Sequence, residues 1–216
     1  MTSPRRALIL VDVQLDYFDG GPLEIQYPPH ADSLPQITRA IDAATAAGIP
    51  VIAVQHTSGE SAPVFNPTLP GFRLHPEVER RRTDDWVGVV KQFGTVFAGT
   101  GIVAQLREWG VDTVTLVGYM TNNCILASAA EAETHGLSAE VLSDATGAIH
   151  LANEQGFADA RTVHTTLMTV LHSNLAAVAP TDAWIDAVSA GVALPGSNLG
   201  ASAMAGAERA RAAVAG

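Results

Sequence analysis

Thr113-Val114-Thr115-Leu116-Val117-Gly118-Tyr119-Met120-Thr121-Asn122-Asn123-Cys124 is the stretch around which the rest of this chain is organised. Residues 113–117 form an apolar run that predicts a buried strand, and a polar bend follows Gly118. The only cysteine, Cys124, lies where a helix over about 122–135 begins. Unpaired N–H groups and the dipole at a helix start favour a thiolate, which predicts a nucleophile of lowered pKa. A lone cysteine is also often a small buried apolar side chain, so position alone leaves both interpretations open.

Strand patterns alternate with helix patterns on both sides of this stretch. Apolar runs predict strands over 7–11, 50–54, 87–91, 113–117, 138–142 and 176–179, and periodic segments predict helices over 32–47, 100–109, 122–135, 153–172 and 181–189. Such alternation predicts an α/β fold with a mainly parallel sheet. We expect one domain over residues 1–189, followed by a Gly/Ala-rich tail over 190–216 that is either a weak helix at 201–214, disordered, or packed on a neighbouring subunit.

Composition restricts the classes of partner. The chain has 216 residues, 47% of them hydrophobic, and a formal net charge of -10. No basic stripe is present, so neither nucleic acid nor an anionic membrane is an expected partner. A single cysteine excludes an internal disulfide and suggests a reducing compartment. With no signal peptide and no apolar stretch long enough to span a bilayer, the expected location is cytoplasmic.

Three reactive side chains fall at the expected ends of strands. Asp12 follows the first strand, Lys91 ends the third and Cys124 follows the fourth. Ligands of open parallel sheets bind beyond the carboxyl ends of the strands, so these residues are expected to meet there. A carboxylate can take the thiol proton, and an ammonium stabilises both anions. The three together indicate an activated nucleophile.

Motifs around these residues extend over most of the chain, from about residue 7 to 185. In order they are Asp12-Val13-Gln14, then Val90-Lys91 with Phe97 and Thr100 downstream, then Gly118-Tyr119-Met120-Thr121-Asn122-Asn123-Cys124. In order and spacing they resemble the isochorismatase-like cysteine hydrolases. The resemblance implies a three-layer αβα fold with a six-stranded, mainly parallel sheet, and a catalytic triad of Asp12, Lys91 and Cys124.

The resemblance also implies a mechanism. Asp12 takes the thiol proton, Cys124 attacks a carbonyl carbon, and a thioester acyl-enzyme is then hydrolysed by water. Backbone N–H groups of Thr121 and Cys124 would hold the oxyanion. Relatives carry a non-proline cis peptide bond in this bend, and their spacing places it between Met120 and Thr121.

Departures from the family pattern narrow the chemistry. Nicotinamidases of this superfamily hold a metal with an Asp and histidines just after the second strand. Here His56 stands in the place of that Asp and Ser58 in the place of the next ligand, so no metal or other cofactor is expected. Family members that cleave an ether lack the cysteine. Cys124 therefore favours cleavage of a C–N bond in a small-molecule amide, lactam or carbamoyl compound.

The residues that shape the pocket are less well determined by sequence. The candidates on strand-end loops, each equally open to a packing role, are Gln14, Phe18, His56, Tyr119 and Asn123. Trp86 and Trp184 are interpreted as core or interface residues. The long irregular segment over 57–85 must bury Val64, Phe65 and Phe72, which predicts a homo-oligomer in which a neighbour walls part of each pocket.

Two rival functions are weighed against the sequence. A dinucleotide-binding oxidoreductase would use Gly99, Gly101 and Ala104, which fit G-x-G-x-x-A at a helix start. Residues 92–98 separate this motif from the preceding strand, and no acid follows about twenty residues on. The other rival is a scaffold that keeps the fold without activity. Apart from these two, a serine hydrolase is also disfavoured, because no G-x-S-x-G occurs in the chain.

Overall fold

The computed structural model describes residues 3–215. Its centre is a six-stranded sheet in the order β3-β2-β1-β4-β5-β8, with every neighbouring pair parallel. The strands are β1 (Arg6–Val11), β2 (Val51–His56), β3 (Val87–Lys91), β4 (Thr113–Tyr119), β5 (Ser138–Gly147) and β8 (Ala177–Ala179). Every residue of β1 and β4 is buried, as their unbroken apolar runs predict.

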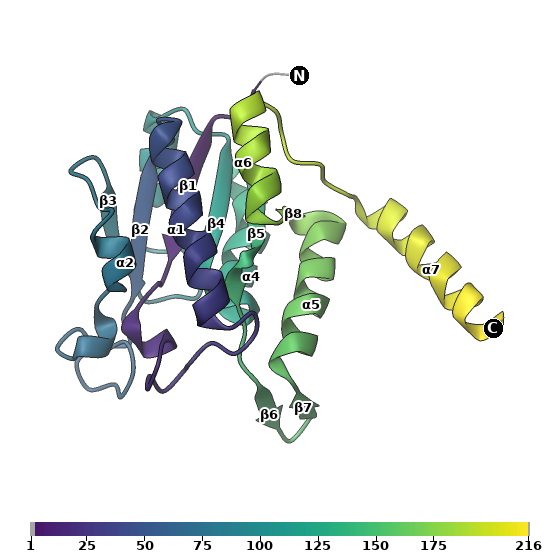
Figure 1. The fold of residues 1–216 in the computed structure, drawn as a ribbon, viewed down its shortest axis with the longest axis horizontal. Helices are drawn as coiled ribbons and strands as arrows, with labels where there is room; N and C mark the ends of the chain where they lie inside the picture. Colours follow the sequence, from purple (N-terminus) through teal and green to yellow (C-terminus); the bar gives the residue numbers. More distant parts are fainter. Residues whose placement is uncertain (1–2, 216) are drawn as a thin grey trace.

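Helices cover both faces of the sheet, so the predicted three-layer αβα fold is confirmed (Figure 1). The helices are α1 (His30–Ala46), α2 (Pro76–Glu79), α3 (Ile102–Glu108), α4 (Leu126–Ala132), α5 (Ala160–Val170), α6 (Thr181–Ala190) and α7 (Leu199–Ala215). Leu8 and Leu10 of β1 pack with α1 and α6, whereas Ile9 and Val11 pack with α3 and α4 on the other face. Successive side chains of a strand point to opposite faces, which gives the domain two apolar clusters.

One predicted helix begins later than expected. Residues 151–158 form the antiparallel hairpin β6 (Leu151–Asn153) and β7 (Gly156–Ala158), and α5 starts only after it. Asn153 closes the turn by accepting from the Gln155 N–H at 2.9 Å. Asp159 is the N-cap, accepting from the Thr162 N–H. The sequence prediction of a helix over 153–172 was therefore wrong at its start, because local turn and cap bonds compete with helix there.

Short helical turns complete the connections between the larger elements. The 3-10 turns are η1 (Leu15–Tyr17), η2 (Pro70–Phe72) and η4 (Glu133–His135), and the π-helical turns are η3 (Thr121–Ile125) and η5 (Leu171–Leu175). η3, α4 and η4 follow one another and end at Gly136, which has a left-handed conformation. The predicted helix over 122–135 is confirmed as this continuous run.

The long segment between β2 and β3 is buried within its own chain. Phe65 is only 5% exposed and belongs to the core, and Val64 packs against the same cluster. Asp16 accepts a hydrogen bond from the Phe65 N–H and anchors the segment beside the first loop. Phe72 and Val64 are both half-buried, so none of the three side chains needs a partner to cover it. These three side chains therefore give no reason to expect a homo-oligomer.

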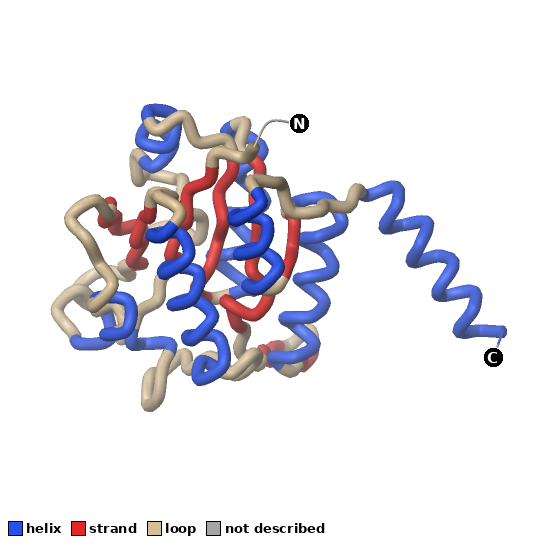
Figure 2. The backbone as a smooth tube through the Cα atoms, turned by 45° about the horizontal axis from the view of Figure 1, so that its top comes forward, coloured by secondary structure: helices blue, strands red, loops and turns tan. Residues whose placement is uncertain are grey.

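The C-terminal helix α7 stands away from the body of the molecule (Figures 1 and 2). Its apolar side chains Leu199, Met204 and Val214 are exposed. Within residues 3–215, no helix has both the length and the apolar character needed to cross a bilayer.

Of the two tryptophans considered above, Trp184 is fully buried, where its Nε1–H reaches Glu140, and Trp86 is half-buried against the same core cluster.

Candidate active site

The carboxyl ends of four neighbouring strands meet at one edge of the sheet. β1 leads into Asp12, β2 ends at His56, β3 ends at Lys91, and Cys124 follows β4. β1 and β4 lie so close at this edge that a Cβ on Gly118 would come within 2.1 Å of the Val11 carbonyl oxygen. Gly118 also has a φ of +108°, so only glycine fits there. The predicted meeting of Asp12, Lys91 and Cys124 is found in the structure.

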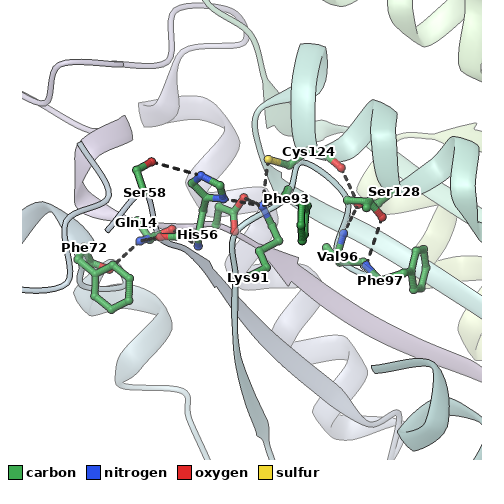
Figure 3. A network of polar contacts seen from close by, with 12 residues as sticks. Gln14, His56, Ser58, Phe72, Lys91, Phe93, Val96, Phe97, Cys124 and Ser128 are labelled. Carbon is green, nitrogen blue, oxygen red and sulfur yellow. Dashed lines mark hydrogen bonds and ion pairs between the residues drawn. The ribbon is translucent and has the colours of Figure 1, made fainter. Parts of the chain in front are cut away.

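The ammonium of Lys91 contacts both of the other reactive side chains of the site (Figure 3). Its Nζ lies 2.7 Å from Asp12 Oδ2, with both side chains fully buried. The same Nζ donates to Cys124 Sγ at 3.2 Å and to the Phe93 carbonyl at 3.1 Å. Lys91 thus contacts both the candidate base and the candidate nucleophile in a site closed to bulk water.

Asp12 is held where it can exchange a proton. Burial raises the pKa of its carboxyl, and the Lys91 ammonium opposes that rise. Among the described residues, neither carboxylate oxygen accepts a hydrogen bond of normal geometry. The carboxylate is paired with Lys91 by charge, and its oxygens have no other hydrogen-bond donor among the described residues. It is therefore suited to take a proton from a neighbouring group.

The thiol of Cys124 differs from the sequence prediction. Burial, and then the negative charge of Asp12, raises the pKa of Cys124 to about 12, and the Lys91 ammonium only partly opposes this. The predicted low pKa is therefore wrong, because desolvation of this 2% exposed side chain outweighs the helix start. In the resting site the proton stays on sulfur and the negative charge on Asp12.

A buried hydroxyl fixes the turn that carries Cys124. Ser128 Oγ donates to the Cys124 carbonyl at 2.6 Å and accepts from the Val96 N–H at 3.0 Å. The loop after β3 is thereby tied to the nucleophile's own backbone (Figure 3). This contact orients the thiol relative to Lys91.

His56 lies beside Lys91. Its Nδ1 is 3.3 Å from Lys91 Nζ and its Nε2 is 3.4 Å from Ser58 Oγ. Burial, followed by the Lys91 charge, lowers the pKa of His56 to about 4, so the ring is neutral near pH 7. A neutral ring accepts at Nδ1 from the ammonium and so braces Lys91. His56 is thus brought into the site, as the sequence predicted, in direct contact with Lys91.

The bend itself departs from the prediction by one residue. The non-proline cis peptide bond is between Tyr119 and Met120, not between Met120 and Thr121. β4 continues through Tyr119 and the helical turn η3 already begins at Thr121, so the change of direction falls at Met120. The roles of the Thr121 and Cys124 amides as oxyanion donors remain predictions.

Three of the five candidate pocket residues are buried and make their contacts within the protein, so a role toward substrate stays a prediction for them. Gln14 is fully buried, and its amide bonds the backbone of His56 and of Phe72. Tyr119 is fully buried, with its hydroxyl 2.8 Å from Ser33 Oγ. Phe18 packs edge-on against the Tyr119 ring in the same core. Gln14 and Phe18 follow β1, Tyr119 is the last residue of β4, and all three side chains are enclosed by the protein rather than exposed at its surface.

Other residues reach the site that the sequence interpretation missed. Tyr17 is buried, and the negative charge of Asp12 adds to burial in raising the pKa of its hydroxyl. Phe93 follows Lys91 and is 59% exposed, and Asn123, which the sequence had already named as a pocket candidate, lies beside Cys124 and is exposed as well. Exposed groups next to the thiol are the natural contacts for a substrate. Only their closeness to Asp12, Lys91 and Cys124 in sequence could have identified them.

The residues around His56 do not fit a metal site of the nicotinamidase kind. Both ring nitrogens already face other groups, one of them a cation. Within residues 3–215, the one group of three potential ligands is Asp19, Glu24 and His30, in which the two carboxylates are exposed and pair with the histidine. No step of the chemistry is therefore derived through a metal.

The dinucleotide interpretation also fails on geometry. β3 ends at Lys91 and α3 begins at Ile102, so an irregular segment separates strand from helix. A phosphate-binding turn of that kind joins its strand directly to its helix. In this chain the intervening loop instead supplies the Phe93 carbonyl to Lys91.

Comparisons with known proteins identify the family of this fold. A family model described as an isochorismatase domain matches residues 6–183. A crystal structure of an isochorismatase-family protein from Burkholderia xenovorans LB400 superposes with a TM-score of 0.93 at 43% identity, covering 100% of both chains.

Two curated relatives extend the comparison. The uncharacterized isochorismatase family protein YddQ of Bacillus subtilis is 31% identical over 180 residues, covering 83% of this chain and 98% of the relative. The nicotinamidase/pyrazinamidase of Mycobacterium tuberculosis is 28% identical over 162 residues, covering 67% of this chain and 87% of the relative.

Proposed function

The chain belongs to the isochorismatase family of hydrolases, and from that premise we propose that it hydrolyses a C–N bond of a small molecule through a thioester on Cys124. The observation that carries the proposal is the Lys91 ammonium, which lies 2.7 Å from Asp12 Oδ2 and 3.2 Å from Cys124 Sγ in a buried site. A carboxylate and a thiol that both contact one cation form an acid–base pair with a nucleophile. The name of the Mycobacterium tuberculosis relative supports an amide as substrate.

Acylation begins with proton transfer from Cys124 to Asp12. Because the thiol's pKa is raised, the thiolate forms as the substrate carbonyl arrives, and the sulfur attacks the carbonyl carbon. The Lys91 ammonium stabilises negative charge on sulfur once Asp12 has become neutral. The oxyanion of the tetrahedral intermediate is received by the backbone N–H groups of Thr121 and Cys124.

The intermediate then collapses and expels the amine. Asp12, now protonated, gives its proton to the leaving nitrogen and returns to the carboxylate form. In the second half, Asp12 takes a proton from water, the resulting hydroxide attacks the thioester, and the proton returns to sulfur. The net reaction consumes one water and yields an acid and an amine, with the enzyme unchanged.

A panel of carboxamides, lactams and carbamoyl compounds, scored for release of ammonia or amine, tests this function. Cys124→Ser keeps the size of the side chain but removes the sulfur, and we expect it to abolish turnover. Ser189→Ala, which alters an exposed hydroxyl bonded only to the Ile185 carbonyl, is the control expected to match wild type. Mass spectrometry of quenched reactions should show the acyl group on Cys124. Turnover by Cys124→Ser at the wild-type rate would exclude the mechanism.

We further propose that α7 packs on a second copy of the chain. α7 has 17 residues, and within 199–214 every residue except the half-buried Ser202 is exposed; a helix packed so little is marginal in water. Its exposed Leu199, Met204 and Val214 supply apolar contact area. Light scattering at micromolar concentration should show a homo-oligomer for the full chain and a smaller species for a chain ending at residue 198. A monomeric full chain would contradict the assembly.

A reducing compartment, such as the cytoplasm, suits this chemistry. Cys124 must remain a free thiol to act as nucleophile, and it is the only cysteine of the chain. The proposed location therefore follows from the proposed mechanism.

A further inference from the structure

Behind the bend lies a buried polar cluster that the proton transfers do not use. It consists of Thr121 on η3, Thr146 on β5 and His164 on α5. Both threonines are fully buried and His164 is 4% exposed. Thr121 Oγ1 lies 3.0 Å from Thr146 Oγ1 and 3.0 Å from His164 Nδ1. The Thr121 hydroxyl on η3 thus contacts side chains from two other elements, β5 and α5.

These contacts suit a neutral imidazole. Burial lowers the pKa of His164 to about 4, so the ring is neutral near pH 7 and carries one N–H and one acceptor nitrogen. The Thr121 hydroxyl can both donate and accept, so it can bond His164 Nδ1 and Thr146 Oγ1 at the same time in either tautomer of the ring.

The ring of His164 is also held from its outer side. It meets the Tyr27 ring edge-on, with 5.7 Å between the ring centres, and the Arg161 guanidinium lies over the same Tyr27 ring. Tyr27 and His164 both line a surface cleft of about 380 Å³. With one edge bonded to the bend and its other side against Tyr27, the imidazole has a single packed orientation. Because the ring is held in one orientation, its hydrogen bond with the Thr121 hydroxyl also restricts the position of Thr121.

Thr121 is the residue through which this cluster can act on the chemistry. It is the first residue of the turn that carries Cys124, and its amide is a proposed oxyanion donor. A β-branched side chain has few rotamers, so anchoring its hydroxyl also anchors its backbone. A donor contributes to catalysis only when it already points to where the charge will develop.

We propose that His164 is a positioning residue, which through the Thr121 hydroxyl holds the bend in the geometry that receives the oxyanion. The inference rests on the proposed function and deepens it. It predicts that His164 matters for attack on a carbonyl and not for the reactivity of the thiol itself.

Two reactions of Cys124 separate these effects. Alkylation by iodoacetamide displaces iodide from a saturated carbon and forms no oxyanion, so it reports on the thiol with Asp12 and Lys91. Acylation by p-nitrophenyl acetate passes through a tetrahedral oxyanion and releases nitrophenolate as it forms the thioester. Both probes act on the full chain and need no knowledge of the natural substrate.

The variant His164→Leu removes the Nδ1 partner of the Thr121 hydroxyl and places an apolar side chain in the buried site. We expect its acylation to be about 10- to 100-fold slower, the range for a misplaced oxyanion donor. Alkylation should stay within about threefold of wild type, since the charges of Asp12 and Lys91 that control the thiol are unchanged. His164→Asn, which can place a polar atom near the position of Nδ1, should recover most of the acylation rate.

Two further variants keep the test decisive. Thr146→Val is isosteric and removes only the hydroxyl, so it should slow acylation in the same selective way even if His164→Leu does not fold. Thr165→Val, on the exposed side of α5, is the matched control and should leave both rates unchanged.

Each outcome decides between positioning and plain structural support. Equal acylation rates in wild type, His164→Leu and Thr146→Val would overturn the inference and leave the proposed function standing. Parallel loss of both reactions would show that His164 only supports the fold, which also overturns it. A wild type that is not acylated at Cys124 would overturn the proposed function itself.

Discussion

Replacing Lys91 with methionine tests the electrostatics of the site most directly. Lys91 and Asp12 are fully buried and 2.7 Å apart, so Lys91→Met leaves a carboxylate buried without its cation. Breaking a buried ion pair in this way costs about 3–5 kcal/mol. The carboxyl can escape that cost only by taking up a proton, because Lys91 is the group that holds its pKa down against burial.

The pH dependence of the penalty follows from that proton. In the variant, folded Asp12 is protonated, whereas the unfolded chain ionises above its ordinary pKa of about 3.9. A folded pKa raised above the unfolded value gives stability that is present at low pH and lost as pH rises. Relative to wild type, Lys91→Met should therefore lose about 1.4 kcal/mol per pH unit once the pH exceeds the folded wild-type pKa of Asp12, which burial already raises above the unfolded value. The loss levels off near about 3–5 kcal/mol, after about three pH units.

Urea denaturation at pH 5 and at pH 8 measures this difference, with Asp12→Asn and the double variant completing a cycle. The double variant has no buried charge left to compensate, so it should be more stable at pH 8 than Lys91→Met alone. A penalty that is equal at both pH values, with additive single effects, would refute the argument that Lys91 serves to hold an ionised Asp12. The activity of Lys91→Met at pH 7 should fall in parallel, because a protonated Asp12 cannot accept the thiol proton.

Three further predictions rest on single contacts. The rate of iodoacetamide alkylation of Cys124 should rise with pH, with an inflection above the free-thiol pKa of about 8.5. Asp12→Asn should lower the pH of that inflection, because the Asp12 charge adds to burial in raising the pKa of the thiol. An inflection below about 8.5 in wild type would show that the helix start dominates. Gln14→Leu should lower the free energy of unfolding by about 2–4 kcal/mol in urea titrations, since it leaves buried backbone groups unpaired; no change would mean that water replaces the amide. Gly118→Ala should cost at least about 3 kcal/mol or prevent folding, since its Cβ would overlap a β1 carbonyl, whereas Gly196→Ala, which meets nothing within 4 Å, should be close to neutral by the same titration.

Sequence alone determined the layers of this protein and the set of reacting groups. Unbroken apolar runs can be satisfied only by strands covered on both faces, and the structure has β1 and β4 buried throughout. Asp12, Lys91 and Cys124 follow such runs, and parallel strands carry their ends to one edge. Their meeting was therefore predictable from position along the chain.

Local bonds decided where the sequence prediction failed. The hairpin over 151–158 displaced the start of a predicted helix because the Asn153 side chain closes a turn there. Gln14 and Tyr119 were expected at the mouth, yet each side chain finds its partners only once distant segments fold over it. A local sequence pattern does not predict hydrogen-bond partners that are far away along the chain.

Only the tertiary structure decided the protonation of the site and the support of its bend. A helix start predicts a lowered thiol pKa, but burial and the Asp12 charge act through space and reverse the sign. His164 has no sequence feature that distinguishes it from a histidine on a solvated helix face, and it contacts Thr121 only because α5 packs behind η3. Sequence specifies which groups are available, whereas the dielectric and the distances that set their chemistry exist only in the folded chain.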